Sequence, residues 1–319
     1  MRAIVIDSLG AEPRLDEAAA PPIPGPGEVL VRVRACGLNF ADLLMIEGKY
    51  QERQSPPFSP GMELSGEVIG LGPGVSGLAV GQRIAAFAGH GGLAEQALAP
   101  AARCVPLPDD MDHVTAAAFQ VAYGTSHLAL LTARLAEGET LLVLGAAGGV
   151  GLTAVEIGRL MGARVIAVAR GAEKLAVAEA AGAQHLIDSD SADVRADVKA
   201  LGGADVVYDP VGGPAFMEAL RATRPGGRML VIGFAGGEVQ QVPANLLLVK
   251  NIHVIGFYWG GHLAFAPGRF AESLGQLFAW YSEGRLKPHV SHVLPLERAG
   301  EGLELLRARK STGKVVVTV

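Results

Sequence analysis

The chain has 319 residues, of which half are apolar and 43 are glycine, so its length suits about two domains with a large core. Its formal net charge of −5, without a long basic run, argues against nucleic acid as a partner, and no apolar stretch approaches the ~18 residues of a membrane span. The N-terminal apolar run is too short for a signal peptide. Cys36 and Cys104 are the only cysteines, so the chain cannot form a disulfide framework or a four-thiolate zinc site. Together these features predict a cytoplasmic protein.

Short strand-like runs fill the first third of the chain and are separated by Pro-Gly and glycine-rich turns. Their spacing predicts an antiparallel, β-rich domain such as a partly open barrel. Helical pattern begins near Asp112, which can cap the helix, and continues from Thr125 to Leu135. The strand-like runs are Met1–Asp7, Glu28–Ala35, Met62–Gly70 and Gln82–Phe87.

The middle of the chain is organised around T-L-L-V-L-G-A-A-G-G-V-G, residues 140–151. A buried strand, Leu141–Leu144, leads into a glycine-rich turn, and an apolar-periodic helix follows from Leu152 to Met161. This order is that of the phosphate-binding unit of a dinucleotide fold, because glycines let the backbone approach a pyrophosphate and the helix N-terminus offers free N–H groups. Ala146 replaces the first glycine of G-x-G-x-x-G, so the turn by itself would also suit a purely structural role.

The strand–helix pattern repeats downstream, which favours the dinucleotide site. A second strand at Arg164–Ala169 precedes a helix at Glu173–Ala181, and such alternation predicts a parallel, doubly wound sheet. Because chain ends often meet, a closing strand could return to the first domain, with the cofactor domain inserted. Further strands are expected at His185–Asp188, Asp205–Asp209, Arg228–Ile232, Ile252–Phe257 and Lys314–Val319, and helices at Arg269–Glu283 and Leu296–Arg309.

Motifs spread over the whole length carry a resemblance to a known family. They are A-C-G-L-N-F-A-D at 35–42, P-G-M-E-L-S-G-E-V at 60–68, A-A-G-G-V-G at 146–151, D-P-V-G-G at 209–213, V-I-G-F-A-G-G at 231–237 and G-K-V-V-V at 313–317. With them the chain resembles the medium-chain dehydrogenase/reductase superfamily, in its zinc-free, zeta-crystallin-like quinone oxidoreductase branch. The resemblance implies an α/β fold: a GroES-like, β-rich catalytic domain of residues 1–118 and 257–319, with an inserted Rossmann domain of residues 119–256.

Zinc-dependent relatives hold their metal with a Cys, a His and a further Cys or Glu. Asn39 and Met62 stand at the first two of those positions, and neither a neutral amide nor a thioether is a usual zinc ligand. Glu63 remains, but one carboxylate cannot make a site. His289 and His292 form an H-x-x-H in a strand-like segment, where residues i and i+3 point to opposite faces. We therefore expect no metal.

The residues after the second strand select the cofactor. NAD sites carry an acidic residue there, whereas this chain has Arg170 and, four residues on, Lys174, which suit a 2′-phosphate and predict NADPH. A solvated helix start, with Glu173 paired to either neighbour, is the alternative. By resemblance, the cofactor site comprises Asn39, Thr125, Ala147, Gly148, Gly149, Val150, Gly151, Arg170, Lys174, Ser189, Gly233, Phe234, Phe257, Tyr258 and Lys314.

Without a metal, hydrogen-bond donors must polarise a substrate carbonyl and the cofactor must supply the hydride. The candidate catalytic residues are Tyr50, Asn39 and Thr125. Tyr50 resembles the proposed proton donor of zinc-free 2-enoyl thioester reductases, and it could equally line the pocket. Asn39 could equally be a turn residue, and Thr125 resembles a family contact to the nicotinamide or its ribose.

The leading prediction is an NADPH-dependent reductase of quinones or similarly conjugated carbonyls. A 2-enoyl thioester reductase and an NADPH-binding protein with little catalysis are the alternatives. Three arginines, Arg53, Arg83 and Arg103, do not cluster in sequence as a groove for a phosphopantetheine thioester would require, which favours small acceptors. A homodimer is expected by analogy, through the strand at Ile252–Phe257, unless that strand is simply the edge of a monomer's sheet.

Overall fold

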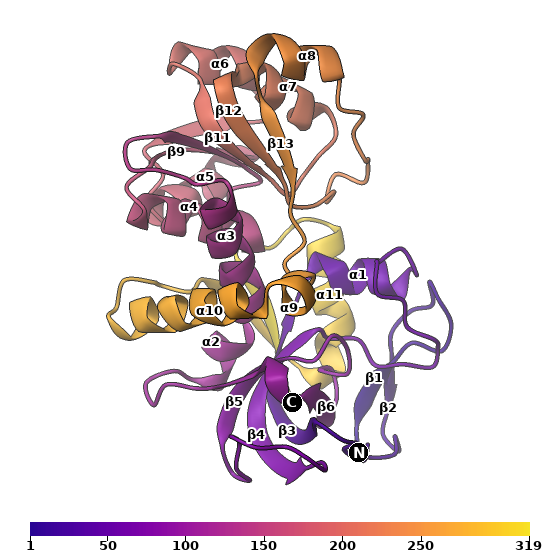
Figure 1. Ribbon diagram of the computed structural model, residues 1–319. Coiled ribbons are helices and arrows are strands. Elements are labelled where there is room, and N and C mark those ends of the chain that lie inside the picture. The colour runs from indigo at the N-terminus through magenta and orange to yellow at the C-terminus, as the bar shows by residue number, and fades with distance from the viewer. The chain divides into compact units, whose positions relative to one another are not determined.

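The computed structural model describes residues 1–319, which form two compact units (Figure 1). The first unit comprises Met1–Val121 and Pro288–Val319, and the second comprises Ala122–Lys287. The first boundary lies close to the expected one at residue 118. The return to the first unit comes at Pro288 and not at residue 257, so the inserted unit is longer than the motif order implied.

Two helices that follow the sheet of the second unit explain this later return. They are α9 (His262–Phe265) and α10 (Pro267–Ser282). The rings of Trp259 and Phe270 lie 4.6 Å apart between centroids, and Nδ1 of His127 lies 2.9 Å from Oγ of Ser273. The contact of His127 with Ser273 attaches α10 to an earlier part of the inserted unit, and the ring contact packs α10 against the residues that precede α9.

The second unit is built on a six-stranded, wholly parallel sheet with the order β10-β9-β8-β11-β12-β13. This is the strand order of dinucleotide-binding folds, and it confirms the doubly wound prediction. The central strand β8 is buried along its whole length, as expected of a parallel strand with both faces covered. The strands are β8 (Thr140–Leu144), β9 (Arg164–Ala169), β10 (His185–Asp188), β11 (Ala204–Asp209), β12 (Thr223–Val231) and β13 (His253–Gly256).

Helices cover both faces of this sheet. Phe216, Leu220 and Leu246 pack with Leu142 in the core of one face. On the other face Gly158 allows close approach, because a Cβ there would lie 2.4 Å from the side chain of Leu141. Besides α9 and α10, the helices are α3 (Gln120–Thr132), α4 (Gly149–Leu160), α5 (Gly171–Ala180), α6 (Val194–Ala200), α7 (Pro214–Ala222) and α8 (Ala244–Lys250).

The first unit contains a seven-stranded, mostly antiparallel sheet with the order β14-β15-β3-β4-β5-β7, and β6 pairs with β3. Strand β15 lies antiparallel to β3, with Val315 opposite Leu38, so the expected closing strand does return to the first unit. The strands are β3 (Glu28–Leu38), β4 (Glu63–Leu71), β5 (Arg83–Phe87), β6 (Gln96–Pro100), β7 (Cys104–Pro106), β14 (Val290–Pro295) and β15 (Lys314–Thr318), with a separate pair β1 (Ala3–Val5) and β2 (Arg14–Asp16).

Three short α-helices complete the first unit. Asp112 caps the second of them, as predicted, by accepting a hydrogen bond from the Thr115 N–H at 2.9 Å. No helix of the chain combines the length and the apolar composition that a membrane crossing needs. The helices are α1 (Phe40–Ile46), α2 (His113–Ala117) and α11 (Ala299–Arg307), with 3-10 turns at Ala101–Arg103 and Leu296–Arg298.

Candidate functional site

The carboxyl ends of the six parallel strands share one edge of the second unit's sheet, where ligands bind in folds of this kind. Most of the predicted cofactor residues follow these strands directly. The glycine-rich turn follows β8, Arg170 follows β9, Ser189 follows β10, Gly233 and Phe234 follow β12, and Phe257 and Tyr258 follow β13. The sheet therefore brings together residues that are spread over more than a hundred positions of sequence.

The glycine-rich turn leaves backbone N–H groups at the start of α4. The first helical bond runs from the Leu152 N–H to the Gly148 carbonyl at 2.8 Å, so the N–H groups of Gly149, Val150 and Gly151 have no acceptor within the helix. Gly151 is required sterically, because a Cβ there would lie 2.2 Å from the carbonyl oxygen of Gly145. Three free N–H groups at the positive end of a helix dipole form a site for phosphate oxygens.

Thr125 lies on α3, the helix that the next residue, Ser126, anchors to this turn. The Ser126 hydroxyl donates to the Val150 carbonyl oxygen at 2.9 Å and lies 3.0 Å from the hydroxyl of Tyr208. These bonds fasten α3 to the first turn of α4 and to β11, and Thr125 itself is 7% exposed. The helix that carries the predicted nicotinamide contact is therefore attached to the predicted phosphate site.

Arg170 is exposed, and no hydrogen bond or ion pair within the chain engages its guanidinium. Next to it, the Gly171 N–H donates to Oδ1 of Asp188 at 3.0 Å. The pKa of Asp188 is lowered, chiefly by this bond and by a second one from the Asp190 N–H. Sequence reasoning missed this carboxylate, because it reaches the turn from the neighbouring strand β10. The turn after β9 therefore carries both a guanidinium without a partner in the chain and an acid that is already bound to the backbone.

Asp209, at the end of β11, belongs to the D-P-V-G-G motif, but sequence reasoning assigned it no role in the site. Its Oδ1 accepts hydrogen bonds from the N–H groups of Val211 and Gly212, both at 2.8 Å, while its buried Oδ2 has no partner. Burial is the main cause of its raised pKa. A buried oxygen without a donor costs free energy until a ligand or water supplies one, which makes Asp209 a further candidate at this edge.

Two aromatic residues stand at the far end of the edge. The side chain of Phe234 is 38% exposed, whereas Phe257 is 7% exposed and packs on His262 with 4.9 Å between ring centroids. The Phe257 N–H donates to the Val231 carbonyl at 3.0 Å, which extends the pairing of β13 with β12. Phe234 is thus available to a ligand, and Phe257 is held mainly by the protein.

In the first unit, Lys314 and Glu63 form a buried ion pair. The Lys314 Nζ lies 2.7 Å from Oε1 of Glu63, and the two side chains are 6% and 1% exposed. The same ammonium donates to Oδ1 of Asn39 at 2.7 Å and to the Leu38 carbonyl at 2.8 Å. All three N–H bonds of the ammonium are therefore used within the unit.

Asn39 is engaged on both sides of its amide. Besides accepting from Lys314, it donates through Nδ2 to Glu63 at 2.9 Å. It also begins α1, where its N–H donates to Asp42 at 2.8 Å. Burial raises the pKa of Asp42 to about 6, against the opposing effect of this bond. Tyr50 is half-buried and lies four residues beyond the other end of α1. The seven-residue helix is about 10 Å long, and it separates Tyr50 from Asn39.

The residues that correspond to zinc ligands of relatives form a different arrangement. Met62 is buried in the core, and Glu63 directs its Oε1 at the Lys314 ammonium. A divalent cation at this carboxylate would meet a positive charge 2.7 Å from the same oxygen. No group of three or more His, Cys, Asp or Glu side chains is arranged to hold a metal ion. This donor set does not fit zinc.

Two family models match the chain. One, described as an alcohol dehydrogenase GroES-like domain, matches residues 25–109, and the other, described as a zinc-binding dehydrogenase, matches residues 149–279.

Whole-length relatives agree with these models. A quinone oxidoreductase-like protein 2 from Bos taurus is 39% identical over 312 residues, with 96% of this chain and 89% of that protein covered. The crystal structure of a quinone oxidoreductase from Thermus thermophilus, also solved with NADPH, has a TM-score of 0.90 at 38% identity, with both chains fully covered. An Escherichia coli quinone oxidoreductase complexed with NADPH has a TM-score of 0.94 at 26% identity, again with full coverage of both chains.

Proposed function

Since the chain belongs to the quinone oxidoreductase family of the medium-chain dehydrogenase/reductase superfamily, we propose that it reduces a quinone or another conjugated carbonyl with NADPH and without a metal ion. The observation that carries this proposal is the carboxyl edge of the parallel sheet. There the free N–H groups of α4 and the unpaired guanidinium of Arg170 stand ready for the phosphates of a dinucleotide. Solved relatives of the same length bind NADPH, which supports this choice of cofactor.

When bound, NADPH supplies a hydride, which with one proton converts a quinone to the hydroquinone. The chain's own residues bind and orient the reactants. Gly149, Val150 and Gly151 hold the pyrophosphate through backbone N–H groups, and Thr125 limits the position of the nicotinamide half beside them. In the first unit, Lys314 and Glu63 fix Asn39 and the start of α1. The proton comes from solvent or from Tyr50.

The test is NADPH oxidation by the purified protein with a simple quinone and with a short enoyl thioester, side by side. We expect faster turnover of the quinone, unchanged by a metal chelator. A preference for the thioester would establish the enoyl reductase instead, and tight NADPH binding with silence toward both acceptors would establish a binding protein. Activity that follows a stoichiometric content of zinc would contradict the metal-free reaction.

Replacing Arg170 with glutamine is expected to weaken NADPH binding about tenfold and to leave NADH binding nearly unchanged, because only NADPH has a phosphate for the guanidinium. Fluorescence titration of both cofactors measures the ratio. Arg269→Gln, an exposed arginine on α10, is the matched control. An equal loss for both cofactors would show that Arg170 does not recognise the 2′-phosphate.

Replacing Tyr50 with phenylalanine separates the two roles of this residue. If Tyr50 lines the pocket, as we expect for quinone reduction, the variant keeps kcat within about threefold of the parent, since a general acid would contribute about a hundredfold or more. The measurement is steady-state kinetics with the better acceptor. A fall in kcat of about a hundredfold with an unchanged KM would make Tyr50 the proton donor.

We also propose that the protein is a homodimer that pairs along β13. This strand is hydrogen-bonded to β12 and forms an edge of its sheet, and the preceding helix α8 exposes Leu248 by 76% and Val249 by 67%. Light scattering should give twice the chain mass of 32.9 kDa. Leu248→Glu with Val249→Glu should halve that value, whereas Val80→Glu, which changes an exposed valine of the first unit, should not. A monomeric parent protein would contradict this proposal.

A further inference from the structure

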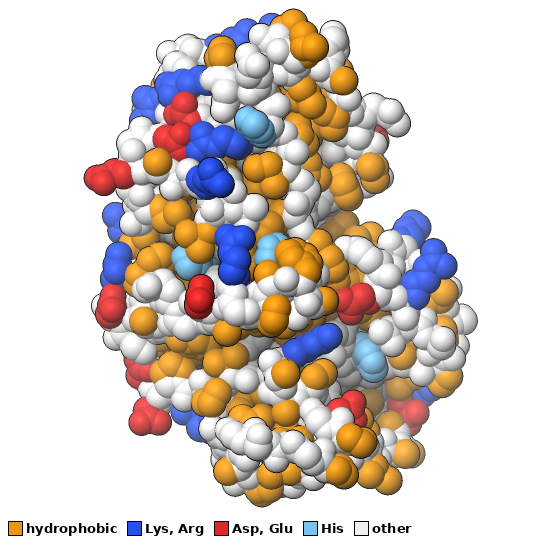
Figure 2. Space-filling view, in the orientation of Figure 1, with side chains coloured by type: hydrophobic (Ala, Val, Ile, Leu, Met, Phe, Trp, Pro, Cys, Tyr) orange, Lys and Arg blue, Asp and Glu red, His pale blue; other side chains and the backbone are white.

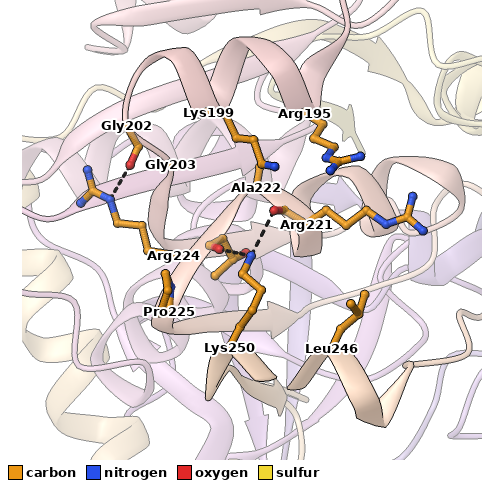
Figure 3. Close-up of a pocket in the computed structure, with 11 residues that line it drawn as sticks. Arg195, Lys199, Gly202, Gly203, Arg221, Ala222, Arg224, Pro225, Leu246 and Lys250 are labelled. Carbon is orange, nitrogen blue, oxygen red and sulfur yellow. Dashed lines mark hydrogen bonds between the residues drawn. The ribbon is translucent and has the colours of Figure 1, made fainter. Parts of the chain in front are cut away.

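The second unit has a pocket at the edge opposite the candidate cofactor site. A cavity of about 490 Å³ lies among α6, α7 and α8 (Figure 3). It reaches Gly202 and Gly203, which precede β11, and Thr223, which begins β12. It therefore lies at the amino ends of the strands, and the six-residue strand β11 separates it by about 20 Å from the carboxyl edge. The glycine-rich turn takes no part in this pocket.

Five cationic side chains line this pocket and no acidic residue does. Because the chain as a whole carries a net charge of −5, a cavity with only positive charges is a local exception. Figure 2 shows Lys and Arg side chains gathered over α6. Like charges in one pocket repel each other, so the arrangement is stabilised by an anion. The cationic lining residues are Arg195, Lys199, Arg221, Arg224 and Lys250.

Two of these cations already have partners. The Nζ of Lys250 donates to three backbone carbonyls around the end of α7, among them Arg221 at 3.0 Å. Arg224 donates to the Gly202 carbonyl and to Asp205, both at 2.6 Å. In contrast, the side chains of the remaining three cations are exposed and form no hydrogen bond or ion pair within the chain; they are Arg195, Lys199 and Arg221.

Stabilisation of helix ends by positive charge does not explain why all five cationic residues are found in this pocket. A cation in the last turn complements the helix dipole, which accounts for Lys199 in α6, Arg221 in α7 and Lys250 in α8, but not for Arg195. Arg195 lies in the first turn of α6, where a cation is unfavourable. It also stands four residues before Lys199, and like charges at that spacing destabilise a helix. Burial, followed by the positive charges of Lys199 and Arg195, lowers the pKa of Lys250, as expected where cations lie close together.

We propose that this pocket binds an oligophosphate anion, that is, a small molecule with two or more adjacent phosphoryl groups. The unpaired cations come from two helices, Arg195 and Lys199 from α6 and Arg221 from α7, and Figure 3 shows the Lys199 side chain directed toward the ammonium of Lys250, with the guanidinium groups of Arg195 and Arg221 to one side of it. Phosphoryl oxygens are the acceptors that guanidinium groups bind best, and a volume of this size holds more than one phosphoryl group.

The test is calorimetric titration of the NADPH-saturated protein with inorganic pyrophosphate, at low ionic strength and without divalent cations. Saturation with NADPH excludes binding of the probe at the cofactor site. We expect pyrophosphate to bind, sulfate to bind at least about tenfold more weakly, and Arg195→Gln with Lys199→Gln to weaken pyrophosphate binding at least about tenfold. A double control, Arg269→Gln with Lys310→Gln, removes two exposed cations elsewhere and should bind like the parent.

The proposal would be overturned if Arg195→Gln with Lys199→Gln bound pyrophosphate as tightly as the control variant. Loss of the pyrophosphate signal when NADPH is present would overturn it too. Tighter binding of a single-stranded oligonucleotide than of pyrophosphate at the same residues would overturn the small-molecule assignment as well. Titration with ADP then identifies the source of the phosphoryl groups. Tighter binding of ADP supports a nucleotide, and equal or weaker binding supports a free oligophosphate. NADPH affinity, measured in parallel, should be the same in all variants, which keeps this test independent of the proposed reductase activity.

Discussion

Replacing Lys314 with methionine is expected to lower the free energy of unfolding by about 3–5 kcal/mol, because it leaves Glu63 as a buried charge without its counterion. The carboxylate would keep two donors, Nδ2 of Asn39 and the N–H of Val121, at 2.9 Å each. Neither carries a positive charge, so they offset only part of the desolvation. Urea denaturation of the purified variant measures the loss.

Two further variants make this prediction specific. Glu63→Gln with Lys314→Met removes both charges and should cost less than the sum of the single changes, since the pair is coupled. Arg298→Met breaks an exposed ion pair with Glu301 on the surface of the same unit and should barely move the denaturation midpoint. A Lys314 variant as stable as the Arg298 variant would contradict a structural role for the buried pair.

Replacing Gly151 with alanine is expected to weaken NADPH binding about ten- to a hundredfold and to lower stability by about 1–3 kcal/mol. The new Cβ would lie 2.2 Å from the carbonyl oxygen and 2.8 Å from the carbonyl carbon of Gly145, and neither backbone atom can rotate away. The turn must therefore shift, and with it the N–H groups that we propose bind the phosphates. Fluorescence titration and urea denaturation report the two effects.

Two other glycines serve as controls for this variant. A Cβ at Gly148, in the same turn, would have its nearest contact at 3.3 Å, so Gly148→Ala should cost less stability than Gly151→Ala. A Cβ at Gly268, at the start of α10, would have no atom within 4 Å, and Gly268→Ala should leave both measurements unchanged. Unchanged NADPH binding by Gly151→Ala would show that the turn does not hold the cofactor.

The sequence predicted the structure best where a local residue pattern and the topology of the sheet lead to the same conclusion. Strand β8, the glycine-rich turn and α4 lie next to one another in the chain, and β9 and β10 match their predicted bounds because each is a short apolar run before a turn. Parallel alternation then implies a shared carboxyl edge, so the positions of Arg170 and Ser189 could be inferred without coordinates.

What the sequence could not show are contacts between distant side chains. The attachment of α10 to the inserted unit depends on pairs such as His127 with Ser273, which no periodicity reveals. The engagement of Asn39 by Lys314 joins residues that the whole inserted unit separates in sequence. Asp188 acts on the turn after β9 from the adjacent strand. In each case the residue type was visible, and its partner was set only by folding.

The pairing of β15 with β3 has a consequence for synthesis of the protein. Residues 122–287 are contiguous, so this unit can fold while the rest of the chain is still being translated. Strand β3 leaves the ribosome before the inserted unit is made, but it gains its neighbour β15 only after that unit is complete. Until β15 is made, the edge of β3 around Leu38 has no strand hydrogen-bonded to it. Chaperones that cover exposed strand edges would therefore be needed by the first unit for longer than by the second, and a pause in translation within the inserted unit would endanger the first unit more.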